Sequence, residues 1–416
     1  WNHKKSIATG PLIMDYLEET IEEYGLDEKI KYNHHVESAN WNESEGLWEV
    51  NVTEKKSSEK FLYKSKFLYM CAGYYRYSSG YEPEFKGSDN FLGQIIHPQK
   101  WPESLDYKGK NVVVIGSGAT AATIVPEIAK EANLVTMLQR SPTYFVSRPD
   151  EDSIALFLKR FLPKSLVYAL IRFKNVYLQQ SLFKRVRAFP DRSKKFLIDQ
   201  VKKELPDFDV DKHFTPRYNP WEQRMCLIPN SDFFEAIKNK TATVVTDHIE
   251  SFEEKGIKLK SGDFLDADII VTATGLVLQN FGGVTISINN NPVNVSETMT
   301  YKSLMYSDIP NFVNSFGYIN ASWTLKADLT SVYLCRLIKH MDKNEYSSAC
   351  PRKPLDVDET YDWLKDFSSG YIQRSINLHP QQGSKKPWVN YQDYIKDWID
   401  VKFSKLEDGN LIFSRD

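Results

Sequence analysis

The sequence predicts an α/β protein of more than one domain, in which parallel strands are buried on both faces. Residues 111–115, Asn-Val-Val-Val-Ile, form the almost wholly apolar run that is typical of such strands. The run leads directly into Gly116 and then into helix-forming residues, and residues 134–138 supply the next apolar strand. Strand, helix and strand in this order make one βαβ unit. Because 416 residues exceed one typical core, we expect two or three interlocked domains.

Composition excludes several classes of protein. Hydrophobic residues at 41% and charged residues at 26% describe a chain that folds, and they exclude a disordered protein or a membrane bundle. The net charge of −2, with both signs interspersed, disfavours binding of nucleic acid or of an anionic membrane over an extended face. The sequence has no apolar run of about eighteen residues and no secretory signal pattern, so we expect a cytoplasmic protein without an integral membrane segment. The oligomeric state stays open.

The cysteines and histidines show no metal-ligand spacing. Cys71, Cys226, Cys335 and Cys350 lie far apart and form no Cys-x-x-Cys pair, which argues against a zinc site and against a redox dithiol. Two of the eight histidines are adjacent, and neighbours on a strand point to opposite faces. We therefore expect reduced thiols and no metal.

The first predicted domain part, residues 1–78, begins with a helix over residues 10–24. Its apolar residues recur at helical spacing opposite acidic ones, at Ile13, Tyr16, Leu17 and Ile21. Stretches rich in β-branched and aromatic residues then predict a small antiparallel sheet and a buried strand, at 29–36, 47–52 and 61–73. The buried strand closes at Cys71-Ala72-Gly73.

Residues 79–275 are predicted to form a second domain with a helical insertion at about 151–240. Helical patterns cover much of the insertion, on either side of a Pro-rich patch at 215–230. Strands return at 241–246, 256–261 and 267–275. Residues 276–416 are predicted to return to the first domain, with the last long amphipathic helix over 325–342.

The glycines after the central strand match a dinucleotide-binding pattern. Gly-x-Gly-x-x-Ala follows a strand and opens a helix, at Gly116, Ser117, Gly118, Ala119, Thr120 and Ala121. The first glycine permits the tight turn, the second lets a pyrophosphate approach the backbone, and the alanine permits close helix packing. The helix N-terminus then faces the phosphates. The alternative interpretation is an ordinary strand-to-helix turn.

The end of the second strand favours NADPH over NADH. An NAD site places an acid there to hold the ribose hydroxyls, but residues 134–149 contain no Asp or Glu. Arg140 follows the strand directly, where its guanidinium could pair with a ribose phosphate, and Ser141 belongs to the same predicted site. The alternative is a solvated surface arginine.

Upstream of this unit stands a second pattern, Phe-x-Gly-x-x-x-His-x-x-x-Trp-Pro. Its fixed positions are Phe91, Gly93, His97, Trp101 and Pro102. Just before a dinucleotide motif, this pattern resembles the signature of the Baeyer–Villiger monooxygenases, a family of class B flavoprotein monooxygenases. A linker that serves packing alone is the alternative. The segments IIHPQKWPESLDY, VTMLQRSPTY, YNPWEQR and GYINASWTLKADL resemble most the branch of the family that activates thioamide prodrugs.

The resemblance implies a glutathione-reductase-like fold of two Rossmann-like domains, with an FAD domain split around an NADP domain. Cys71-Ala72-Gly73 and Ala273-Thr274-Gly275 would mark the two crossings, and the second triplet is counted with the cofactor site. Such enzymes use FAD, NADPH and O2 to insert oxygen next to a ketone carbonyl, which gives an ester or lactone, and they often oxidise sulfur in thioethers or thioamides.

The resemblance also assigns roles to single residues. Arg224 matches the arginine that stabilises the negatively charged flavin peroxide, although the residue could instead be an ion-paired surface arginine. His97 corresponds to a residue that positions the linker and couples the domains, rather than to a general base, with Trp101 packed beside it. Asn320 and Trp323 precede or open a helix whose N-terminus could face the flavin, unless Ser322 merely caps that helix.

One feature of the family has no counterpart in this sequence. The Gly-x-Gly-x-x-Gly that cradles FAD is absent upstream of Trp1, so the first dinucleotide domain is expected to be incomplete and the chain inactive by itself. A flavin N- or S-oxygenase is the alternative enzyme. A degenerate NADP-binding module, or an inactive fragment, is the alternative from another class.

Overall fold

The computed structural model describes residues 3–353, 360–364 and 367–415, so Trp1 lies outside the described residues. The chain forms two compact units. Unit 1 comprises Trp1–Tyr16, Tyr77–Lys174 and Leu182–Val277, and unit 2 comprises Leu17–Arg76, Asn175–Ser181 and Leu278–Asp416. The crossings at 76/77 and 277/278 lie within two residues of the boundaries expected at 78/79 and 275/276.

Two segments group differently from the expected division. The first sixteen residues cluster with unit 1, because Ser6 and Ile7 donate backbone hydrogen bonds to the Asp150 carbonyl, at 2.6 and 3.1 Å. Residues 175–181 cluster with unit 2, where Gln179 Nε2 donates to the Asn320 carbonyl at 3.0 Å. Neither contact joins residues that are close in sequence, so local patterns do not reveal them.

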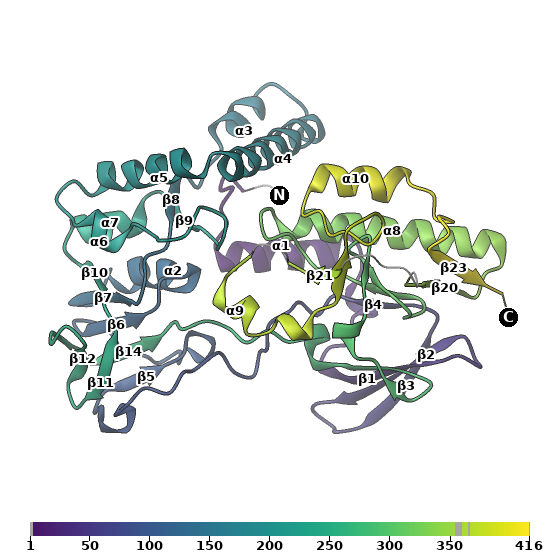
Figure 1. Ribbon diagram of the computed structural model, residues 1–416, viewed down its shortest axis with the longest axis horizontal. Helices are drawn as coiled ribbons and strands as arrows, with labels where there is room; N and C mark the ends of the chain where they lie inside the picture. Colours follow the sequence, from purple (N-terminus) through teal and green to yellow (C-terminus); the bar gives the residue numbers. More distant parts are fainter. Residues whose placement is uncertain (1–2, 354–359, 365–366, 416) are drawn as a thin grey trace. The chain divides into compact units, whose positions relative to one another are not determined.

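Unit 1 is built on a parallel sheet of five strands in the order β10-β7-β6-β14-β5 (Figure 1). Every neighbouring pair in this sheet is parallel. The strands are β5 (Gln94–Ile96), β6 (Asn111–Ile115), β7 (Leu134–Gln139), β10 (Ala242–Thr246) and β14 (Ile269–Thr272). The α/β class with parallel strands is therefore confirmed, and β6 has neighbours on both sides.

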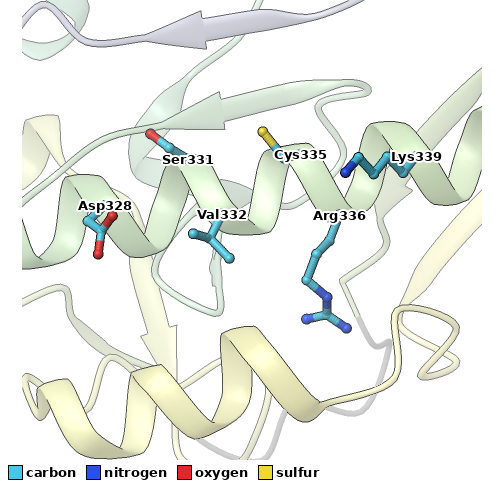
Figure 2. Close-up of a pocket in the computed structure, with 6 residues that line it drawn as sticks. All are labelled: Asp328, Ser331, Val332, Cys335, Arg336 and Lys339. Carbon is cyan, nitrogen blue, oxygen red and sulfur yellow. The ribbon is translucent and has the colours of Figure 1, made fainter.

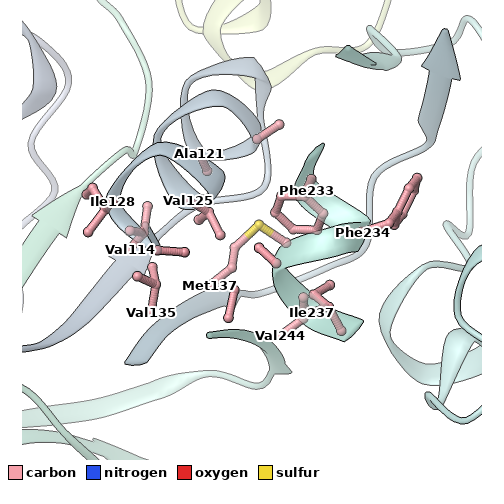
Figure 3. Packing of buried hydrophobic residues seen from close by; sticks show 14 of the residues in the cluster. Val114, Ala121, Val125, Ile128, Val135, Met137, Phe233, Phe234, Ile237 and Val244 are labelled. Carbon is pink, nitrogen blue, oxygen red and sulfur yellow. The ribbon is translucent and has the colours of Figure 1, made fainter. Parts of the chain in front are cut away.

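The two faces of this sheet are covered by different elements. Val112 and Val114 face a core formed with helices α2 (Ala119–Ile128) and α7 (Asp232–Lys238). Figure 3 shows Val114 in this core, together with Ala121 and Phe233. Val113 and Ile115 face a second core under the antiparallel strands β11 (Ile249–Glu253), β12 (Gly256–Leu259) and β13 (Phe264–Asp266). Alternating apolar residues are thus buried on both sides, which explains the continuous apolar run of β6.

The predicted helical insertion is largely helical. It contains α3 (Ser153–Leu158), α4 (Lys164–Ala188), α5 (Pro190–Glu204) and α6 (Val210–His213), followed by α7. Inside it, β9 (Cys226–Pro229) pairs in parallel with β8 (Phe145–Arg148). This pairing joins the end of the Pro-rich patch to β8, the strand that follows β7 in the chain.

Unit 2 contains a five-stranded sheet in the order β16-β15-β1-β2-β3. Its members are β1 (His34–Asn42), β2 (Leu47–Glu54), β3 (Lys60–Ser65), β15 (Thr285–Ile288) and β16 (Asn291–Pro292). The predicted antiparallel arrangement is confirmed for β1, β2 and β3, whereas β15 pairs with β1 in parallel. The first strand begins at His34 rather than at residue 29, because Asn33 adopts φ 60°. Segment 61–73 divides into β3 and β4 (Leu68–Met70), and Cys71 is exposed.

The long helix predicted near the end of the chain is confirmed as α8 (Trp323–Asn344), which buries one face in unit 2. β4 pairs in parallel with β19 (Phe312–Asn314). The remaining helices are α9 (Gly370–Gln373) and α10 (Tyr394–Phe403), and α1 (Gly10–Glu23) spans both units. Short pairs complete the unit: β17 (Thr300–Tyr301) with β18 (Met305–Tyr306), β20 (Ser348–Pro351) with β23 (Leu411–Ser414), and β21 (Thr360–Asp362) with β22 (Gln381–Gly383).

Candidate functional site

The turn after β6 requires glycine at its first position. Gly116 adopts φ 136°, and a Cβ atom there would lie 2.3 Å from the Ala273 carbonyl oxygen. The Gly116 N–H donates to the Leu138 carbonyl at 2.8 Å, so the turn is tied to both neighbouring strands. The end of β14 thus lies against the glycine turn, at the carboxyl edge where parallel sheets of this type bind ligands.

The second glycine faces open space instead. Gly118 is the N-cap of α2 in an extended conformation, and a Cβ atom built on it meets no atom within 4 Å. Two positions into the helix, Ala121 is completely buried in the sheet core. The first turn of α2 has no side-chain cap, so its N–H groups are available to an anionic ligand.

We expect Gly118→Ala to weaken NADPH binding by about tenfold or more, about 1.4 kcal/mol, without destabilising the fold. The added methyl group occupies the space that a pyrophosphate needs but touches no protein atom. A fluorescence titration with NADPH and a thermal unfolding scan would measure the two effects. Gly116→Ala is the contrasting variant, because its Cβ collides with backbone and its φ is left-handed. Unchanged NADPH affinity in Gly118→Ala would contradict the assignment.

Ser117 fastens the glycine turn to two other segments. Its hydroxyl donates to the Ser141 carbonyl at 3.2 Å and lies 3.1 Å from the Thr143 hydroxyl. Its own carbonyl accepts from Cys226 Sγ at 3.6 Å. Burial raises the pKa of the Cys226 thiol to about 12, so the thiol remains a neutral donor. The turn is therefore held in place by the segment between β7 and β8 and by β9.

The structure brings Arg140 and Ser141 to the same edge as the glycine turn. β7 ends at Gln139, whose buried amide donates to the His213 carbonyl at 2.7 Å. Arg140 and Ser141 follow and are exposed. Since the Ser117 hydroxyl bonds to the carbonyl of Ser141, the backbone of Arg140 lies close to the glycine turn and to the predicted phosphate site.

Arg224 lies in the loop that leads into β9, and it is exposed. Its positive charge lowers the pKa of the Cys226 thiol, against the larger effect of burial, which places the guanidinium within electrostatic range of that thiol. Cys226, two residues later, contacts Ser117, so the loop that carries Arg224 continues directly into a segment that touches the glycine turn. Trp221 in the same loop adopts φ 70° and makes an edge contact with Phe183, at 5.4 Å between ring centroids.

His97 joins the segment that enters unit 1 to the segment that leaves it. The ring is buried, its Nδ1 accepts from the Gln99 N–H at 3.2 Å, and its Nε2 lies 3.3 Å from the Gly275 carbonyl oxygen. The same carbonyl accepts from the Tyr81 N–H at 3.0 Å. Both ring nitrogens are engaged, with Nε2 as the donor, so the geometry favours a positioning role over proton transfer.

The other residues of this pattern support its fold. Phe91 is buried in the core under the antiparallel strands, and a Cβ on Gly93 would lie 2.2 Å from the Asp268 carbonyl oxygen. Trp101 packs against the core formed with α2, and Pro102 is exposed. Thr274 donates through its hydroxyl to the Tyr81 carbonyl at 2.5 Å, next to the Gly275 contact.

Asn320 and Trp323 lie at the start of α8 in unit 2. The buried Asn320 amide donates to the Gln392 carbonyl at 2.8 Å, while its Oδ1 lacks a hydrogen bond within the described chain. The Trp323 ring stacks on Tyr74, at 4.7 Å between centroids. Ser322 occupies the N-cap position, but its hydroxyl bonds to Thr324 Oγ1 instead of capping the helix. The two interpretations of this helix start are thus distinguished in favour of an uncapped N-terminus.

A family model described as flavin-binding monooxygenase-like matches residues 8–310 of the chain. The chain belongs to this flavin-binding monooxygenase family. It is 46% identical to the FAD-containing monooxygenase EthA of Mycobacterium tuberculosis over 418 residues, which cover all of this chain and 85% of the relative. It is also 42% identical to the probable FAD-binding monooxygenase AlmA of Acinetobacter baylyi, over all of this chain and 83% of the relative.

Solved structures share the family fold. An oxidized steroid monooxygenase bound to NADP superposes with a TM-score of 0.76 at 20% identity, over all of this chain and 87% of that one. The cyclohexanone monooxygenase of Rhodococcus sp. Phi1 bound to NADP+ gives a TM-score of 0.65 at 19% identity, over 84% of this chain and 73% of that one. The predicted membership and the predicted fold class are therefore confirmed.

A depression of about 340 Å³ lies outside the predicted site of this family member. Six residues of α8 line it: Asp328, Ser331, Val332, Cys335, Arg336 and Lys339 (Figure 2). The Arg336 guanidinium donates hydrogen bonds to the carbonyls of Val401 and of Ser404, the latter at 3.0 Å. These bonds tie Arg336 to the end of α10. We assign this depression no part in the chemistry.

Several contacts of the site left no signal in the sequence. Gly80 lies so close to His97 that a Cβ atom would be 1.9 Å from the ring, yet Gly80 belongs to no pattern. Thr143 and Cys226, which hold Ser117, are equally inconspicuous. Across residues 3–353, 360–364 and 367–415 we find no cluster of metal-ligating side chains. No helix in those ranges is both long enough and apolar enough to pass through a bilayer.

Proposed function

We propose that this protein is an NADPH- and FAD-dependent monooxygenase that inserts one oxygen atom of O2 next to a ketone carbonyl. The observation that carries the proposal is the Phe91–Pro102 pattern, whose His97 is fixed on Gly275 at the exit from the glycine-turn unit. Because Gly275 lies just before the point where the chain leaves unit 1, His97 can couple nucleotide binding in unit 1 to that connection. Membership of the flavin-binding monooxygenase family supports the same reaction class.

In this proposal residues 79–275 bind NADPH, and residues 1–78 and 276–416 contribute part of the FAD site. The pyrophosphate lies over Gly118 and the first turn of α2, where a side chain would intrude. Arg140 binds the ribose phosphate and Ser141 lies beside it. Ala273, Thr274 and Gly275 fix the position of the glycine turn, since the Ala273 carbonyl lies directly against Gly116.

Arg140→Ala is expected to raise the Michaelis constant for NADPH by about tenfold or more and that for NADH by less than about twofold. Only NADPH carries the phosphate that the guanidinium would bind. Steady-state rates with each nucleotide measure the difference. Arg148→Ala is the matched control, because Arg148 is also an exposed arginine at a strand end, one strand later. Equal changes for both nucleotides would remove the argument.

The start of α8 fits the flavin. Its uncapped N-terminus offers N–H groups to an electron-rich edge, and the buried Asn320 Oδ1 can accept a hydrogen bond from a ring N–H. Trp323 fixes this helix start by stacking on Tyr74. When bound, FAD reduced by NADPH supplies the chemistry that activates O2. Arg224 supplies a fixed positive charge where negative charge develops on the oxygen to be transferred.

A ketone panel tests the proposal. Protein that carries bound FAD is supplied with NADPH and O2 and with 2-alkanones or phenyl ketones, and products are identified by mass spectrometry. We expect esters with one added oxygen atom from O2. NADPH oxidation that yields hydrogen peroxide with every ketone, and no ester, would refute the proposed reaction.

Oxidation of sulfur or nitrogen is the second candidate. The resemblance to the thioamide-activating branch, together with 46% identity to EthA over the whole chain, favours sulfur oxidation as an additional activity. A thioether assay alone does not distinguish the two enzymes, because Baeyer–Villiger monooxygenases also form sulfoxides. Sulfoxide formation without any ester would favour the flavin N- or S-oxygenase.

A further inference from the structure

Large apolar side chains form regular stripes on α3 and α4 that are turned to solvent. In and just after α3, Ile154, Phe157 and Phe161 recur at i, i+3 and i+7, with exposed fractions of 53% to 70%. On α4 the spacing is i, i+4, i+7 and i+11, with exposed fractions of 43% to 72%, at Leu166, Leu170, Phe173 and Tyr177. A surface helix normally turns such a stripe toward the core.

The same segment carries charge of one sign. Residues 153–189 contain no Asp or Glu and eight basic residues: Lys159, Arg160, Lys164, Arg172, Lys174, Lys184, Arg185 and Arg187. Since the whole chain carries −2 and this segment +8, the rest of the chain carries −10. The net charge near zero therefore conceals a strongly basic region in an acidic protein.

The two helices are connected as one structural element. Lys174 Nζ on α4 forms an ion pair of 2.5 Å with Asp152 Oδ2, and Asp152 is also the N-cap of α3, where it accepts from the Ala155 N–H at 3.1 Å. The rings of Phe157 and Phe161 lie 5.2 Å apart. This pairing also neutralises the acid that borders the segment.

We propose that the α3–α4 surface binds an anionic lipid bilayer, with both helices lying in the plane of the interface. Exposed Leu, Ile and Phe side chains beside Lys and Arg are the chemistry that enters such an interface. A second copy of the chain is disfavoured as the occupant, because the basic residues of two copies would face each other in a symmetric contact. Nucleic acid would use the charges but not the aliphatic stripes.

Co-sedimentation of the full chain with lipid vesicles tests this proposal and requires neither cofactor, so its outcome is independent of the proposed chemistry. We expect binding to vesicles of equimolar phosphatidylcholine and phosphatidylglycerol, much weaker binding to phosphatidylcholine alone, and release in about 1 M NaCl, where charges are screened within about 3 Å. Phe157→Ser/Phe161→Ser/Leu170→Ser and Lys159→Glu/Arg160→Glu should each lower binding by about tenfold. These side chains are exposed, so circular dichroism should remain unchanged.

The matched control is Ile13→Ser/Leu17→Ser on α1. Both residues are 47% exposed, but α1 carries five acids and no basic residue, so we expect binding to stay within about twofold. Absence of binding to the mixed vesicles would overturn the proposal, as would an equal loss in the α1 variant. A change in molar mass by light scattering without a change in vesicle binding would identify a second copy as the occupant instead.

Discussion

Arg224→Ala should lower oxygen insertion by about 10²–10³-fold, about 2.7–4 kcal/mol in transition-state free energy, while reduction of bound flavin by NADPH stays within about twofold. The guanidinium is exposed in the loop before β9. In the proposed function it stabilises only the negative charge that develops on the transferred oxygen. Stopped-flow reduction and product analysis separate the two steps. Hydrogen peroxide should replace the ester as the product.

Arg217→Ala is the control for this experiment, because Arg217 is an exposed arginine in the same Pro-rich patch but outside the family segment YNPWEQR. Its product yield should match the unmodified protein. Arg224→Lys keeps the charge and should recover part of the yield, although lysine lacks the planar fork. Ester formation that survives in Arg224→Ala would discard the role of this residue.

Local chemistry explains which elements could be predicted. The strand at Asn111–Ile115, the turn at Gly116 and the helix that buries Ala121 are adjacent in sequence, and each step has a steric or hydrogen-bonding reason that one window contains. The long helix after Asn320 is equally local. The lack of an acid in residues 134–149, with Arg140 directly after β7, is a local feature of the same kind.

Contacts between distant segments could not be predicted. The bond from His97 to Gly275 spans 178 positions, and the one from Cys226 to Ser117 spans 109. The local sequence around a histidine or a cysteine does not indicate which distant residue it will contact. The parallel pairing of β8 with β9 also escaped prediction, because the segment between them reads as helix.

The average charge of a chain hides local differences. Acids and bases nearly balance over all 416 residues, whereas segment 153–189 contains eight basic residues and no acid, and its apolar stripes are exposed. The helix predicted at residues 10–24 is confirmed as α1, but its apolar face is not buried. Periodicity predicts the element, and only packing decides what its apolar face contacts.

Asp397→Ala should destabilise unit 2 by about 3–5 kcal/mol, because it removes the acceptor of a buried ion pair. Lys326 Nζ lies 2.8 Å from Asp397 Oδ2, and the two side chains are 2% and 6% exposed. Tyr318 donates to the same oxygen at 2.7 Å. Without the carboxylate, an ammonium and a hydroxyl remain buried, and α8 loses its link to α10 next to the proposed flavin contact.

Chemical denaturation followed by tryptophan fluorescence would measure this loss. Lys326→Met/Asp397→Leu removes both charges and should cost much less than Asp397→Ala, because no unpaired charge remains buried. The surface pair of Lys202 with Asp211, at 2.9 Å and 46% and 75% exposed, supplies the control: Asp211→Ala should cost less than about 0.5 kcal/mol. If Asp397→Ala and Asp211→Ala shift the transition equally, burial does not determine the strength of the Lys326 pair, and the α8–α10 contact must be held by its apolar side chains alone.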